Sequence, residues 1–164
     1  MAQDDDRFHS NLFTATDTGR VKIFFAFDDD GSTQTETMWA KPIGDGVFLL
    51  DSVPFFVDGV SCGDKLYAQR ASDGALEFAG VAEAGGHSTY RVILAEDTPT
   101  EQARQQWLEL EQLGCGREMV SDLIWAMDLP PPVDIARVHD VLERGAAAGV
   151  WDFEEAHVGH GLRG

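Results

Sequence analysis

Between Trp39 and Arg91, short apolar runs are separated by turns that contain glycine, and this alternation restricts the first half of the chain to a β-rich fold. Turns that recur about every eight to twelve residues are typical of small barrels and bent antiparallel sheets. We therefore expect about five or six short strands that form a small β-barrel or a strongly bent sheet.

Local patterns place the individual strands. The run from Val21 to Phe27 is rich in aromatic and β-branched residues and ends at a turn of three aspartates and a glycine. Further strands are predicted at 36–41, 47–50, 65–70 and 76–83. Pro42 should end the second of them, and Gly44-Asp45-Gly46 predicts a hairpin. Pro54 removes a backbone donor, so 53–57 is interpreted as a buried crossing loop or an edge strand.

The pattern changes after Arg91: Tyr90 to Leu94 predicts a strand, and a helical pattern follows it. Thr98 is expected to cap a helix that has Pro99 at its first position, with Glu101 completing a capping box. The helix should end near Gly114. A buried stripe at helical spacing follows the predicted cap: Ala103, Trp107 and Leu110.

The rest of the second half alternates strands with helices. Residues 119–129 predict one long strand or a hairpin bent at Ser121-Asp122, a second helix runs from near Asp134 to near Gly145, and 150–153 form a last strand. This order matches a ferredoxin-like sandwich. The predicted class is α+β, with an N-terminal small β-barrel or bent antiparallel sheet packed on a C-terminal ferredoxin-like half. The expected divisions are a loose acidic arm at 1–19, a β-rich half at 20–86, a ferredoxin-like half at 87–155 and a tail at 156–164.

Composition limits the class of protein. A hydrophobic fraction of 43% with ten Phe and four Trp is ample for a core. No apolar run approaches the roughly 18 residues of a membrane helix, and the acidic start differs from a signal peptide, so we expect a cytoplasmic protein. In that compartment Cys62 and Cys115 should be free thiols, and a reactive thiol at Cys62 is the alternative.

The formal net charge of −17 is the strongest compositional feature. Phosphate contacts need clustered Lys and Arg, so the charge argues against binding of DNA or RNA. It permits a basic partner. The alternatives are an acidic surface without further meaning and a mimic of nucleic acid that neutralises a basic protein.

Several elements in order and spacing resemble an uncharacterised bacterial family, domain-of-unknown-function family 4265, over roughly residues 21–155. They are Met38-Trp39-Ala40, Leu50 to Phe56, Gly59-Val60-Ser61, Gly63-Asp64, Gly86 to Arg91, Gly114 to Glu118, Ile124 to Pro130 and Trp151. Ser52 departs from the pattern, where Asn is expected. The resemblance implies an outline of the fold and no activity.

A polar row follows the glycines at 85 and 86. In an extended chain His87, Thr89 and Arg91 share one face, and together they offer an imidazole, a hydroxyl and a guanidinium suited to a carboxylate or phosphate. The structural alternative pairs Arg91 with Asp58 or Asp64, with His87 bonded to the backbone. Ser88 points away from His87, so the two are not predicted to form a nucleophile–base pair.

The C-terminal tail carries Glu154, His157 and His160, which are possible zinc ligands at three-residue spacing. We expect a solvated tail instead, because the nearby glycines favour fraying, and we predict no metal and no cofactor. The four tryptophans, with Phe55 and Phe56, are expected to serve core and interface packing rather than the stacking of bases, since no basic residues are interleaved with them.

These patterns favour an acidic, non-catalytic binding or regulatory module whose partner is a protein or peptide, possibly basic, and neither nucleic acid nor membrane. The alternative is a small enzyme or anion-binding protein with its site around His87, Arg91 and Asp64. The two differ in whether these polar groups are mutually satisfied or left free in a pocket.

Overall fold

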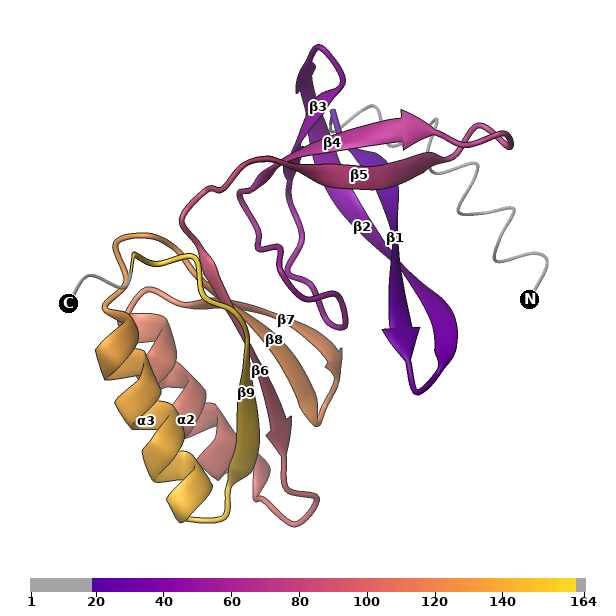
Figure 1. Cartoon of the computed structure of the whole chain (residues 1–164). Coiled ribbons are helices and arrows are strands. Elements are labelled where there is room, and N and C mark those ends of the chain that lie inside the picture. The colour runs from indigo at the N-terminus through magenta and orange to yellow at the C-terminus, as the bar shows by residue number, and fades with distance from the viewer. Residues whose placement is uncertain (1–18, 162–164) are drawn as a thin grey trace.

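The first half of the chain forms a closed barrel of five strands in the computed structural model, which describes residues 19–161 (Figure 1). The strands are β1 Val21–Asp29, β2 Ser32–Gly44, β3 Val47–Leu50, β4 Lys65–Arg70 and β5 Leu76–Glu83. Consecutive strands pair antiparallel, and β1 closes the barrel by pairing in parallel with β5 at Ile23 and Phe24. The predicted small barrel is confirmed. Apart from Gly19, the predicted acidic arm lies outside the described residues.

The second strand continues through Pro42, contrary to the prediction that this proline ends it. The pairing of β2 with β3 shifts register between Pro42 and Gly44, and this irregularity accommodates a residue that cannot donate to the ladder. The hairpin at Gly44-Asp45-Gly46 is confirmed. All three residues have positive φ, of 107°, 57° and 73°, which glycine adopts without steric cost and aspartate tolerates.

The barrel interior is filled by the alternate residues of its strands. The strand residues in this core are Ile23, Phe25, Met38, Ala40, Phe48, Leu50 and Leu66. Two residues of the loop between β3 and β4, Val57 and Val60, are buried in the same cluster. The loop is therefore part of the barrel core rather than a free connection.

The second half is a four-stranded antiparallel sheet with two helices on one face (Figure 1). Its elements are β6 Ser88–Leu94, α2 Thr100–Gln112, β7 Gly116–Ser121, β8 Ile124–Leu129, α3 Ile135–Ala147 and β9 Trp151–His157. The strand order is β7-β8-β6-β9, with β7 and β9 at the edges. The hairpin bent near Ser121-Asp122 is thus found in place of one long strand.

The core of this half lies between the sheet and the helices. Trp125 contacts Trp107 and Trp151 edge to face, with ring centroids 5.7 and 5.8 Å away. All three rings are at most 7% exposed. The expectation that these tryptophans pack in the core is confirmed. No helix within residues 19–161 is long and apolar enough to cross a membrane.

The helix ends differ from the predictions in two places. Pro99, not Thr98, is the N-cap of α2, and no side chain caps this helix. In α3 the predicted cap is confirmed, since the Asp134 carboxylate accepts from the amides of Ala136 and Arg137. However, the helix runs past Gly145, where a Cβ would lie 2.4 Å from the Trp151 ring. That glycine permits close packing and does not end the helix.

The Thr98 hydroxyl donates instead to the backbone carbonyl of Val150 at 2.8 Å, across to the start of β9. We predict that Thr98→Ala lowers the free energy of unfolding by about 1 kcal/mol through this lost bond. The helix itself should begin at the same residue. Urea denaturation of the two proteins measures the change, and coincident midpoints would contradict it.

Candidate functional site

The loop between β3 and β4, residues 51–64, lies between the two halves, and we name it the joint loop. Its inner side contributes Val57 to the barrel core. Its other side meets the face of the second sheet that the helices leave uncovered (Figure 1), where Arg91 donates to the Val57 carbonyl at 2.6 Å. The Val53 amide also donates to Glu118 of β7 at 3.1 Å. The joint loop therefore links the barrel to the second sheet.

Glu36 of β2 holds the Pro-Phe-Phe part of the joint loop. Its carboxylate accepts from the amides of Phe55, Phe56 and Val57 at 2.7, 3.1 and 3.0 Å. Glu36 is only 8% exposed. Three consecutive amides around one carboxylate form an anion-binding concavity that the chain fills by itself.

Arg91 ties the joint loop to β6 and β9. Besides the Val57 carbonyl, its guanidinium contacts Asp58 at 3.0 Å and Glu154 at 3.3 Å. The Arg91 side chain is 11% exposed, whereas those of Asp58 and Glu154 are 75% and 65% exposed. The predicted pairing of Arg91 with Asp58 is found. The two carboxylates that pair with Arg91 are largely exposed to solvent.

Asp64 does not contact Arg91, although the sequence made it a possible partner. The Asp64 carboxylate, 1% exposed, accepts from the amides of Ser61 and Gly85 at 3.0 and 2.8 Å. It fixes the end of the joint loop against the segment that enters β6. This is a structural role that an aspartate fills well, because its short side chain bonds nearby backbone amides.

Ser61 and Thr89 form the buried centre of the joint. Their hydroxyls lie 2.6 Å apart, and both residues are fully buried. The Ser61 hydroxyl also lies 2.8 Å from Nδ1 of His157. Thr89 and Arg91 thus share the uncovered face of β6, as the alternation of a strand predicts, and both are engaged by the joint loop.

His87 lies beside the joint and pairs with Asp128 rather than with the backbone. Its Nδ1 is 2.8 Å from the Asp128 carboxylate. The ring packs on Gly63, where a Cβ would lie 2.7 Å from the His87 Nε2 atom. Gly63, at φ +89°, is therefore required both by the turn and by this close approach.

Burial raises the pKa of the Asp128 carboxyl above its usual 3.8, and the hydrogen bond from His87 offsets only part of the effect. A carboxyl with a raised pKa in the folded state costs stability that is absent below about pH 3.8, grows as the pH rises from there to the raised pKa, and stays constant above it.

We therefore predict that Asp128→Asn gains stability relative to wild type as the pH rises from 3 to 6. The amide keeps an oxygen for His87 but does not ionise. Unfolding free energies of both proteins over this range measure the difference, and a difference that stays constant or falls with pH would contradict the prediction.

The end of the described chain is packed rather than solvated, which corrects the expected tail. Ser88 lies 2.6 Å from Nδ1 of His160 and accepts from the amides of Gly159 and His160. Glu154 and His157 lie in strand β9 and not in a helix. Glu154 pairs with Arg91, and His157 bonds Ser61, so the helical arrangement considered for a zinc site is not formed. Among residues 19–161, no group of three His, Cys, Asp or Glu side chains is placed to hold a metal ion.

Both cysteines are free and poorly suited to nucleophilic chemistry. Burial, with smaller effects from Asp128 and Asp51, raises the pKa of Cys62 to about 12. Burial likewise raises the pKa of Cys115 to about 12. A thiol needs a lowered pKa to supply thiolate near neutral pH, so the environment of Cys62 disfavours the reactive-thiol alternative.

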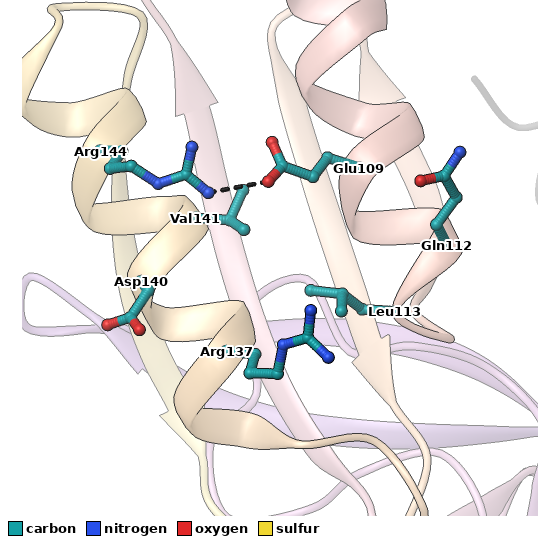
Figure 2. Close-up of a pocket in the computed structure, with 7 residues that line it drawn as sticks. All are labelled: Glu109, Gln112, Leu113, Arg137, Asp140, Val141 and Arg144. Atoms are coloured by element: carbon teal, nitrogen blue, oxygen red, sulfur yellow. Dashed lines mark hydrogen bonds and ion pairs between the residues drawn. The ribbon is translucent and has the colours of Figure 1, made fainter.

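The larger cavities lie away from this joint. A cavity of about 550 Å³ lies between α2 and α3. Arg144 of α3 and Glu109 of α2 form an ion pair of 2.8 Å across it (Figure 2). A cavity of about 440 Å³ lies beside α2, and another of about 470 Å³ lies against the barrel strands. None of these three is lined by His87, Arg91 or Asp64.

The sequence interpretation missed several residues of the joint. The local pattern places Glu36 in a strand without assigning it a role, yet Glu36 is in phase with the inward-facing Met38 and Ala40, and a carboxylate in that row signals a buried acceptor. Asp128 likewise interrupts an apolar strand. Ser61 gave no comparable signal, because its partners are distant in sequence.

The comparisons with known proteins agree with this outline. The family model described as "Domain of unknown function (DUF4265)" matches residues 36–153. The chain belongs to this family. No curated protein matches the chain. Among solved structures, a hypothetical protein from Neisseria gonorrhoeae is similar, with a TM-score of 0.75, 19% identity, and coverage of 85% of this chain and 96% of that one. At that identity the likeness shows the fold alone.

Proposed function

We propose that this member of family 4265 is a non-catalytic binding module for a basic protein or peptide. The observation that carries the proposal is the engagement of the polar row. Thr89, Asp64 and both terminal nitrogens of Arg91 are committed to contacts that hold the joint loop, and of these groups only the buried Nε of Arg91 has no hydrogen-bond partner within residues 19–161. A catalytic or anion site would need such groups directed into a pocket with unmet bonds.

The surface that supports the proposal lies beside the joint, on the uncovered face of the second sheet. Ile93, two residues beyond Arg91 on the same face of β6, is 55% exposed. Phe56, next to the carbonyl that Arg91 binds, is 53% exposed and stacks on Phe27 at 5.5 Å. Exposed apolar side chains on either side of Arg91 support an interaction surface.

Carboxylates lie next to these residues in the strand register and along the joint loop, and they indicate a basic partner. Asp152 is opposite Ile93 in the register of β6 with β9, and Glu154 is opposite Arg91. Asp58 follows Val57 in the joint loop. Because Arg91 compensates only one of these three charges, the surface remains negative within a chain of net charge −17. Such a surface attracts cationic partners and repels nucleic acid.

The alternative, an enzyme or anion site around His87, Arg91 and Asp64, has less support. The His87 ring is packed against Gly63, and Asp64 is 1% exposed. The buried oxygens of Asp64 already accept two amides, so they are not free for an incoming group.

Two finer assignments belong with this proposal. We infer a ferredoxin-like architecture for the second half, supported by the strand–helix–strand–strand–helix–strand order and the β7-β8-β6-β9 arrangement. We also infer a cytoplasmic location, which the two free cysteines support.

The test is calorimetric titration with a short peptide in which lysine and leucine alternate, compared with a peptide that has glutamine in place of lysine. The wild-type protein should bind the lysine peptide at least about tenfold more tightly. Ile93→Ser should weaken that binding about tenfold, because it removes the central apolar contact.

Leu108→Ser is the matched control, since Leu108 is 38% exposed on α2, on the other side of the sheet. It should leave binding unchanged. Equal affinity for the two peptides, no binding of either, or equal losses in Ile93→Ser and Leu108→Ser would contradict the proposal.

A further inference from the structure

A separate cavity of about 440 Å³ lies beside α2, between its first turns and the edge strand β7. Thr100, Ala103 and Arg104 of α2 line one side, and Arg117 and Met119 of β7 line another. Its volume falls within the range of small-molecule sites. No residue of the joint loop lines this cavity, and neither does His87, Thr89 or Arg91.

Neither guanidinium group of this cavity forms an ion pair within the described residues, and Glu111 acts on Arg117 only from beyond ion-pair distance. Within residues 19–161, no carboxylate lies at ion-pair distance from Arg104 or Arg117, although the chain has 29 acidic residues and 12 basic ones. Arg117 lies over the rings of Trp107 and Trp125, at 4.4 Å from each centroid. This stacking fixes its position and leaves its donors available.

The remaining lining favours an apolar group next to the charge. Trp125 and Leu94 belong to the core at its inner side. Met119 and Leu123 line it as well and are 47% and 36% exposed, so a ligand would remove apolar surface from water.

We propose that this cavity binds a carboxylate that carries an apolar group. The carboxylate pairs with Arg104 and Arg117, since a guanidinium matches a carboxylate in two parallel hydrogen bonds. Partial burial favours an anion further, because it lowers the pKa of Arg117, Glu111 offsets only part of that effect, and an incoming carboxylate compensates the rest. The apolar group lies against Met119, Leu123 and Trp125.

Glu96 and Asp122 also line the cavity and would attract an amine instead. Both are exposed, so they remain hydrated and gain less from a partner than the partly buried Arg117. The proposal is therefore tested most directly by whether the cavity prefers a carboxylate or an amine.

The experiment titrates the full chain with octanoate below its micelle concentration, followed by calorimetry and by the fluorescence of the tryptophans beneath Arg117. Octanoate should bind saturably although the chain as a whole repels anions. Arg104→Gln should weaken binding at least about tenfold, and Arg104→Lys should weaken it less, because it keeps the charge and loses the planar fork. Octylamine should bind at least about tenfold more weakly than octanoate.

Arg137→Gln is the matched control, because Arg137 is another exposed arginine, has no ion pair with any residue of 19–161, and lines the groove between α2 and α3 (Figure 2). It should leave octanoate binding unchanged. The proposal is overturned by a lack of saturable octanoate binding, by octylamine binding as tight as that of octanoate, or by equal affinities of Arg104→Gln and Arg137→Gln. These outcomes do not involve Ile93, so they are independent of the peptide test.

Discussion

Replacing Glu36 by alanine is expected to lower the free energy of unfolding by about 4 kcal/mol, the largest single effect that we predict. The change leaves the amides of Phe55, Phe56 and Val57 without their common acceptor. A charged acceptor contributes more per bond than a neutral one, and an unsatisfied buried donor keeps its full desolvation cost.

Glu36→Gln should lose about half as much, because the amide oxygen retains one acceptor without the charge. Glu77→Ala is the control, since Glu77 is exposed on β5 and should change stability by less than about 0.5 kcal/mol. Guanidinium denaturation measures all three. A Glu36→Ala midpoint equal to that of Glu77→Ala would refute the role of Glu36.

Arg91→Ala is expected to lower the free energy of unfolding by about 2 kcal/mol. The cost arises mainly at the Val57 carbonyl and in the lost packing of a side chain that is only 11% exposed. The carboxylates of Asp58 and Glu154 contribute less, because they are exposed enough to be hydrated without Arg91. A mechanism based on orphaned buried carboxylates, which would raise the cost to about 3 kcal/mol, does not match this geometry.

Asp58→Ala separates the two contributions, since it removes a carboxylate and keeps the guanidinium. It should cost less than about 1 kcal/mol. Arg91→Lys should recover about half of the loss, because an ammonium can reach the carbonyl but lacks the planar fork. If Asp58→Ala destabilises as much as Arg91→Ala, the carboxylate and not the carbonyl is the main partner.

The strands were predictable from local patterns. Alternation and turn glycines located all five barrel strands, and the spacing of Ala103, Trp107 and Leu110 gave the buried stripe of α2. These features depend on residues close in sequence, where the spacing of apolar residues directly reflects the period of a strand or a helix.

The predictions were wrong where a residue far away in sequence determines the role of a side chain. Thr98 has the local pattern of a cap, but the Val150 carbonyl takes its hydroxyl. Gly145 has the pattern of a helix end, but Trp151 requires its lack of a side chain. His160 looked solvated near several glycines, yet it bonds Ser88. In each case tertiary contacts override local propensity.

Amide hydrogen exchange at Phe55, Phe56 and Val57 tests most directly whether the polar residues serve to hold the joint loop. Wild-type protein should protect these three amides, because Glu36 accepts all of them. In Arg91→Ala their protection should fall, while the amides of β1 in the barrel stay protected. Rapid exchange of the three amides in the wild-type protein would contradict this role and would leave Glu36 and Arg91 free for a ligand.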